Sequence, residues 1–131
     1  MKNRCENCGR CCVDTEMILS QQDIKLIKSS LSSKIRIQDF AFKNKDKQFQ
    51  LKNIQGNCVF FDYTSKKCNI YKFRPQGCKF YPLTYDLNKK KCKLDEDCPR
   101  TNLFYKTNQD IKKDCQNLKI FLKKQLKMNL N

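Results

Sequence analysis

The sequence predicts an α+β fold: a small, cysteine-rich, metal-organised domain with a short antiparallel sheet and two flanking helices. Three observations lead to this fold class. The 131 residues include ten cysteines, several times the usual content of a globular chain. Two stretches repeat apolar residues at helical spacing, and several shorter ones alternate apolar and polar residues as half-buried strands do. Because a chain of this length buries one modest core, we expect a single domain over residues 1–131.

The first element is a dense run of cysteines at Cys5, Cys8, Cys11 and Cys12. Four thiols within eight residues are not scattered core positions, and Gly9 lets the backbone turn between them. The first three follow the spacing that opens bacterial ferredoxin sequences, Cys-x2-Cys-x2-Cys. Cys12 breaks that spacing and projects in a different direction from Cys11. We interpret the run as one half of a metal site.

Metal is favoured over a disulfide scaffold because the sequence gives no sign of secretion. Residues 1–4 lead directly into the cysteines without the apolar segment of a secretory signal, and no apolar stretch is long enough for a transmembrane segment. We therefore expect a cytoplasmic protein whose thiols stay reduced. The chain has no histidine, so its metal ligands would be thiolates, and zinc hydrolases with imidazole ligands are excluded.

The next two stretches are expected to supply structure. Residues 13–33 predict a lead-in and a helix, with Ser20 and Asp23 forming a capping box at its start. Apolar residues follow at helical spacing at Ile24, Ile27 and Leu31. Within residues 34–56, residues 34–38 alternate, and residues 49–54 predict a strand. Three phenylalanines could form a substrate-facing wall, but packing in a small core is favoured. They are Phe40, Phe42 and Phe49.

The second set of cysteines begins with a predicted hairpin from Cys58 to Cys68. Apolar residues flank its polar turn at residues 64–67, and closing the hairpin would place the two cysteines opposite each other.

Beyond the hairpin, Pro75 and Gly77 predict a turn that brings Cys78 to the same place. Arg74 is expected to be extended because it precedes proline. Its guanidinium either donates to a sulfur or a carboxylate, or lies exposed on the loop.

Together these motifs resemble the CxxCxxCC, or YkgJ-type, cysteine-cluster family. The chain shows CxxCGxCC at residues 5–12, CxFFD from Cys58 and CxIYxxRPxxC from Cys68 to Cys78. An aromatic residue precedes Pro82, and a late Cys98-Pro99 pair closes a resemblance that covers residues 5–98. Members are described as zinc- or iron-chelating domains and often as iron–sulfur proteins. Flagellin lysine N-methylases are relatives.

The resemblance implies eight metal ligands. They are Cys5, Cys8, Cys11, Cys12, Cys58, Cys68, Cys78 and Cys98.

Residues 83–87 predict a strand, and a turn at residues 88–91 leads into Cys92. Cys92 lies outside the family pattern. It could be a ninth ligand or a substitute for Cys98, but a thiol that binds no metal is favoured. The acidic cluster at residues 95–97 is expected to be a solvated turn rather than a catalytic site.

The clearest predicted helix covers residues 108–127, with Thr107 as its cap. Its apolar stripe consists of Ile111, Cys115, Leu118, Leu122 and Leu126. We expect Cys115 to be a buried, small hydrophobic residue in that stripe. Packing of the helix over the sheet is favoured over a role at a membrane surface.

Eight thiolates could hold one or two [4Fe–4S] clusters, or alternatively two Zn²⁺ ions as a structural staple. The ferredoxin-like opening, the family resemblance and a group of aromatic residues favour iron–sulfur. The aromatic residues are Phe60, Phe61, Tyr63, Tyr71, Phe80 and Tyr81.

Three functions remain open. They are an iron–sulfur protein for electron transfer to a redox partner, an enzyme related to protein-lysine methylases, and a zinc-stabilised interaction module. The net charge of +15 comes mostly from lysine and predicts a solvated surface that could meet an acidic protein. No motif resembles a nucleic-acid recognition module, so specific nucleic-acid binding is not expected.

Overall fold

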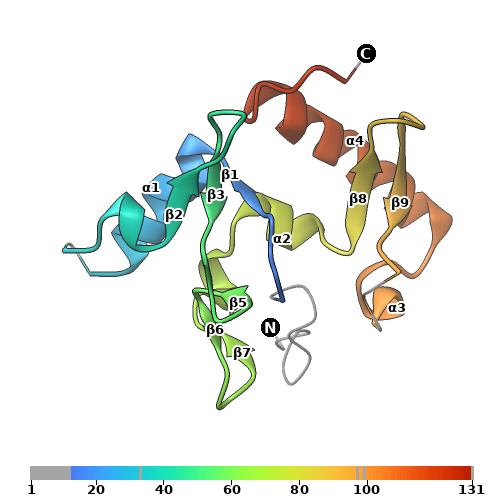
Figure 1. Cartoon of the computed structure of the whole chain (residues 1–131). Helices are drawn as coiled ribbons and strands as arrows, with labels where there is room; N and C mark the ends of the chain where they lie inside the picture. The colour runs from blue at the N-terminus through green and yellow to red at the C-terminus, as the bar shows by residue number, and fades with distance from the viewer. Residues whose placement is uncertain (1–12, 33, 97, 99, 131) are drawn as a thin grey trace. The chain divides into compact units, whose positions relative to one another are not determined.

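The computed structural model describes residues 13–32, 34–96, 98 and 100–130. The chain divides into two compact units, an N-terminal unit of Met1–Gln76 and a C-terminal unit of Gly77–Asn131. The predicted α+β class is confirmed, because short antiparallel sheets combine with two longer helices, α1 and α4 (Figure 1).

Besides two short 3-10 helices, the described residues of the N-terminal unit form one α-helix and seven short strands. They are β1 (Ile18–Leu19), α1 (Gln21–Ser30), β2 (Ala41–Lys43), β3 (Phe49–Leu51), β4 (Asn53–Ile54), β5 (Asn57–Cys58), β6 (Phe61–Asp62) and β7 (Lys67–Cys68). The order β1-β3-β2 forms a three-stranded sheet, while β4 pairs with β5 and β6 pairs with β7. Every pairing is antiparallel.

Helix α1 begins at the predicted capping box. The Asp23 N–H donates to Ser20 Oγ at 3.1 Å, and the Ser20 N–H donates to Asp23 Oδ2 at 3.0 Å. These bonds satisfy two backbone donors that the first turn of a helix would otherwise leave unpaired. Ile24 and Ile27 are buried, so the predicted apolar face is confirmed.

The core of this unit forms around Phe40, which is 1% exposed, and Phe60, whose ring centroid lies 5.7 Å away. Phe49 packs against the same cluster, whereas Phe42 is 42% exposed. Packing in a core is therefore the correct interpretation for Phe40 and Phe49 and is wrong for Phe42. Phe42 lies between Ala41 and Lys43 on β2, where alternate side chains face opposite sides of the sheet.

The alternation at residues 34–38 does not produce a strand. A 3-10 helix forms instead at Ile37–Asp39, because the Asp39 carboxylate accepts the Arg36 N–H at 2.9 Å. This backbone hydrogen bond is the main reason that the pKa of Asp39 falls below the ordinary 3.8. A local side-chain cap outweighs the apolar pattern here.

The C-terminal unit is a hairpin covered by a long helix. Its elements are α2 (Gln76–Phe80), β8 (Leu83–Asp86), β9 (Lys91–Leu94), α3 (Thr101–Phe104) and α4 (Asn108–Lys124). The first residue of α2, Gln76, is counted with the N-terminal unit. The strand predicted at residues 83–87 is present as β8, and the turn predicted after it leads back into β9, the antiparallel partner of β8. Thr107 caps α4 by accepting the Asp110 N–H at 3.1 Å.

The core of the C-terminal unit is buried between α4 and β8. Its buried residues are Leu83, Tyr105, Leu118 and Phe121. The Tyr105 hydroxyl donates to the Phe80 carbonyl oxygen at 2.7 Å, and burial raises the pKa of Tyr105 far above its ordinary value. Within the described ranges, no helix combines the length and apolar character needed to cross a bilayer.

Candidate metal centre

The structure places four of the eight ligand candidates. Cys58 lies on β5 and is buried, and Cys68 lies half-buried on β7. Cys78 on α2 and Cys98, just before α3, are half-buried in the C-terminal unit. The other four candidates lie outside the described residues, and they are Cys5, Cys8, Cys11 and Cys12.

The predicted hairpin is present between Cys58 and Cys68, but its register is not the expected one. Phe61, and not Cys58, is the partner of Cys68, and Cys58 pairs with Asn53 of β4 instead. The expectation that the two cysteines face each other across the hairpin is therefore wrong. The strands are shorter than the apolar pattern implied, because Asp62 starts the turn early.

The turn of this hairpin is held by Asp62. Its carboxylate accepts Ser65 Oγ at 2.9 Å and the Thr64 N–H at 3.0 Å, and its carbonyl oxygen accepts the Lys66 N–H at 2.7 Å. The hydrogen bond from Ser65, followed by that from Thr64, lowers the pKa of Asp62 below 3.8. The ionised carboxylate therefore stabilises the turn that carries Cys68 at pH values above 3.8, and this contribution is lost as the pH falls through the lowered pKa.

The segment that follows the N-terminal cysteine run is bound to the hairpin that carries Cys58. Val13, the residue after Cys12 in the sequence, forms an antiparallel bridge with Asn57. The Asp14 N–H donates to the Gly56 carbonyl oxygen at 2.8 Å. The described chain therefore begins next to the strand that holds Cys58.

Asn53 extends this attachment by one more residue. Its Oδ1 accepts the Thr15 N–H at 3.0 Å, and its Nδ2 donates to the Thr15 carbonyl oxygen at 2.9 Å. The side-chain amide thus pairs with a backbone as a neighbouring strand would. Asn53 could not be identified from the sequence, because a single asparagine after an apolar strand has no distinguishing pattern.

A tight turn positions Gly56 and Asn57, the residues that bind Asp14 and Val13. Gln55 has φ of 52° and Gly56 has φ of 82°, and these two positive angles match the type I′ turn that joins β4 to β5. A side chain at position 56 would be strained in this conformation, which explains the glycine. The turn ends at Asn57, directly before Cys58.

The expected turn at Pro75 and Gly77 is a helix. Pro75 directly precedes α2, where its restricted φ is compatible with a helix start, and Cys78 lies within the helix. The buried carboxylate of Asp23 accepts the Gln76 N–H at 3.0 Å. The helix that carries Cys78 therefore starts from a residue bound to α1.

Arg74 follows neither of its two predicted roles. Its backbone is extended, as expected before proline, with ψ of 151°. Its Nε donates to the Tyr71 carbonyl oxygen at 3.0 Å, and its guanidinium carbon lies 3.9 Å from the centroid of the Tyr71 ring. Arg74 therefore braces the 3-10 helix at Tyr71–Phe73.

Asp95 forms hydrogen bonds with both Tyr81 and Cys98. Its carboxylate accepts the Tyr81 hydroxyl at 2.9 Å, and its carbonyl oxygen accepts the Cys98 N–H at 3.2 Å. Glu96 is exposed, as expected for a solvated turn, whereas Asp95 is half-buried and structural. Asp97 and Pro99 lie outside the described residues.

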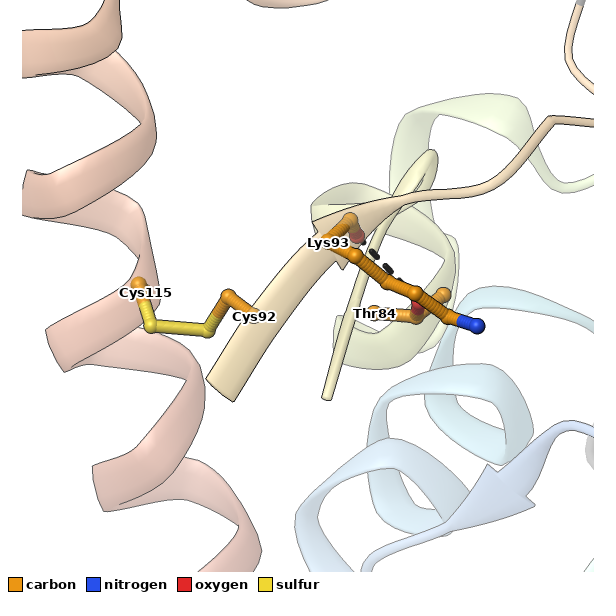
Figure 2. The surroundings of a disulfide bond; sticks show 4 residues. All are labelled: Thr84, Cys92, Lys93 and Cys115. Atoms are coloured by element: carbon orange, nitrogen blue, oxygen red, sulfur yellow. Dashed lines mark hydrogen bonds between the residues drawn. A yellow bond between two sulfur atoms is a disulfide. The ribbon is translucent and has the colours of Figure 1, made fainter. Parts of the chain in front are cut away.

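Cys92 and Cys115 form a disulfide, with a Cα–Cα distance of 6.0 Å (Figure 2). The sequence favoured a non-ligand role for both residues, which agrees with this bond. The expectation that the thiols are reduced is wrong for this pair, because the two sulfurs are bonded. The expectation that Cys115 is a buried hydrophobic residue is also wrong, because Cys115 is half-buried. The two cysteines are 23 residues apart, on a strand and a helix, so no local sequence pattern indicates that they pair.

A hollow of about 440 Å³ opens beside Cys58. Its walls are formed by Ile54, Gln55, Asn57, Cys58, Val59, Phe61 and Tyr63. Within the part of the chain that the structure describes, no three Cys, Asp or Glu side chains are grouped as a metal site would require.

Comparisons with known proteins agree with the cysteine pattern. The model of the CxxCxxCC family, described as "Putative zinc- or iron-chelating domain", matches residues 4–116. "Uncharacterized protein MJ0661" of Methanocaldococcus jannaschii is 32% identical over 99 residues, which cover 63% of this chain and 52% of that protein. The chain thus spans about half the length of this curated relative. No solved structure matches this chain significantly.

Proposed function

The chain belongs to the CxxCxxCC family of zinc- or iron-chelating domains, and we propose that it is an iron–sulfur protein that transfers electrons to a partner protein. The clusters would be one or two [4Fe–4S] centres, each with four thiolate ligands. When bound, such a cluster accepts and releases single electrons. The proposed ligands are Cys5, Cys8, Cys11, Cys12, Cys58, Cys68, Cys78 and Cys98.

The attachment of residues 13–15 to the β4–β5 hairpin is the observation that carries this proposal. Val13 directly follows Cys12 in the sequence, and the residues that bind Val13 and Asp14 are Asn57 and Gly56. Those residues are next to Cys58 in the sequence. The fold therefore supports a site that combines cysteines from distant parts of the chain.

A hydrogen bond fixes the start of α2, the helix that carries Cys78. Asp23 binds the Gln76 N–H, and Cys78 follows Gln76 by two residues. In the C-terminal unit, Asp95 restrains Cys98 through its backbone.

The surroundings of Cys58 favour an iron–sulfur cluster over a bare zinc ion. Cys58 is 7% exposed and belongs to the apolar cluster that contains Phe40 and Phe60, and Cys68 packs against the same cluster. The hollow beside Cys58 adds Val59 and Phe61 as apolar walls. Apolar walls exclude water from a cluster and influence its reduction potential.

The test is elemental analysis of anaerobically purified full-length protein. An iron–sulfur protein should contain iron and acid-labile sulfide in equal amounts, be brown, and absorb broadly near about 400 nm. Colourless protein with about two zinc ions per chain and no sulfide would overturn the proposal and support two all-thiolate zinc sites. A zinc-stabilised module would suit a lysine-rich surface that meets an acidic protein.

Replacing Asn53 should weaken metal binding without removing a ligand. We expect Asn53→Ala to lower the metal affinity by up to about thirtyfold, since two hydrogen bonds of about 1 kcal/mol each no longer hold Thr15 against β4. The protein is placed in competition with a chelator, and the amount and rate of metal release are measured. Asn53→Asp keeps only the acceptor for the Thr15 N–H and should give an intermediate loss.

Asn44→Ala is the matched control for Asn53. Asn44 Oδ1 accepts the N–H groups of Asp46 and Gln48 at 2.9 and 3.0 Å, within the turn between β2 and β3. This variant loses a similar number of hydrogen bonds away from Cys58. If both variants release metal equally fast, the Asn53 attachment has no particular role in the site.

A further inference from the structure

We propose that Cys92 and Cys115 form a thiol–disulfide exchange site, separate from the metal ligands, that reacts with small disulfides of the glutathione class. Neither residue is among the eight ligand candidates. The two come from β9 and α4 and are bonded to each other in the structure (Figure 2). The chain thus carries two sets of cysteines with different chemistry.

The backbone brings the two sulfurs together whether or not they are bonded. In β9, Cys92 and Leu94 are half-buried, whereas Lys91 and Lys93 are exposed, so alternate residues face opposite sides of the hairpin. Figure 2 shows the disulfide extending from β9 to α4, with the Lys93 side chain directed away from that helix. On α4, Cys115 lies three residues before Leu118, about one helical turn away.

The core of the C-terminal unit holds this arrangement independently of the disulfide. Leu83 of β8 and Leu118 and Phe121 of α4 are buried together, and Cys92 and Cys115 pack against the same cluster. A Cα–Cα distance of 6.0 Å is within the range that a disulfide requires. After reduction, the two thiols therefore remain close enough to react with each other again.

The local charges favour reaction. The Lys119 Nζ lies 5.9 Å from the centroid of the Tyr85 ring, and Tyr85 is the cross-strand partner of Cys92. A cationic side chain on this side of the hairpin attracts anionic small disulfides to the pair. The nearby carboxylates are engaged elsewhere, since Asp86 pairs with Lys93 at 4.0 Å and Asp114 interacts with Tyr105.

The exchange takes place in two steps. One protein thiolate attacks a sulfur of the small disulfide, breaks its S–S bond and releases one small thiolate, leaving a mixed disulfide on the protein. The second protein thiolate then attacks the protein sulfur of that mixed disulfide and releases the second small thiol. Two electrons and two protons pass from the protein dithiol to the small disulfide, and excess small thiol reverses the reaction.

Closing the bond should stabilise the C-terminal unit without changing its fold. The disulfide closes a loop of 23 residues between β9 and α4, which restricts the unfolded chain. The buried core remains in the reduced protein, so we expect reduction to lower the Tm by roughly 10 °C rather than to unfold the unit. The metal ligands are unaffected.

The experiment equilibrates the metal-loaded full-length protein with glutathione buffers of increasing oxidised fraction, then alkylates the remaining thiols and maps them by mass spectrometry. The expected result is complete conversion of Cys92 and Cys115 to a disulfide with unchanged metal content. The proposal would be overturned if both residues were found as alkylated thiols at every glutathione ratio, or if either residue were paired with a different cysteine.

Variants separate this site from the metal centre. Cys92→Ser and Cys115→Ser should each stop at the mixed disulfide with glutathione, which mass spectrometry detects on the remaining thiol. The double variant should form neither species and bind the same amount of metal per chain as the unaltered protein. Loss of metal from a folded double variant would show that the pair belongs to the metal site. The titration of the unaltered chain tests the proposal without any variant.

Discussion

Cys68→Ser should abolish metal binding at the centre and leave much of the N-terminal unit unfolded. Serine is a poor ligand for zinc or iron compared with a thiolate. Metal binding by such a small domain is also folding free energy, so losing one ligand destabilises the fold as well as the site. Metal content per chain and far-ultraviolet circular dichroism measure the two losses on one sample.

The matched control is Cys115→Ser. This change also removes one sulfur, and it breaks the disulfide to Cys92, but it should leave metal content unchanged. Equal loss of metal from both variants would contradict the division into ligands and a disulfide pair. Full retention of metal by Cys68→Ser would remove Cys68 from the set of ligands.

Phe40→Ala should destabilise the chain by about 3–5 kcal/mol, because it leaves a cavity in a packed core. Phe40 is 1% exposed and its ring lies 5.7 Å from that of Phe60. Domains of this size have a free energy of unfolding of about 5–15 kcal/mol, so the loss is a large part of the total. The loss of free energy is measured by unfolding the metal-loaded protein in urea and monitoring its fluorescence.

Phe42→Ala provides the comparison, since Phe42 lies on β2, two residues after Phe40, and is 42% exposed. Surface changes of this kind usually alter the free energy of unfolding by less than about 0.5 kcal/mol. A loss at Phe42 as large as that at Phe40 would mean that another surface covers Phe42. Both results together distinguish core packing from a substrate-facing wall.

Local signals explain which elements the sequence predicted. Ser20 and Asp23 begin α1, and Thr107 begins α4, because a capping side chain needs only backbone groups two or three residues away. The hairpin of β8 and β9 is equally local, with Asp86 accepting the N–H groups of Asn88 and Lys89 in its turn. Each signal and its consequence lie within one short segment.

The prediction was wrong where two local preferences competed. Asp62 starts the turn of the β6–β7 hairpin early, which moves Cys68 opposite Phe61. Pro75 is compatible with both a turn and a helix start, and the Gln76 N–H bound by Asp23 accompanies the helix. In both places a hydrogen bond decided between conformations that the residue types alone allow.

The sequence by itself determined the α+β class, the two longer helices and the family to which the cysteine pattern belongs, because capping, periodicity and motif spacing are properties of short segments. Only the tertiary structure decided that Asn53 holds the segment after the cysteine run and that Cys92 bonds to Cys115. Those partners are 38 and 23 residues apart. Contacts over such distances depend on how packed elements meet, and no local pattern records that.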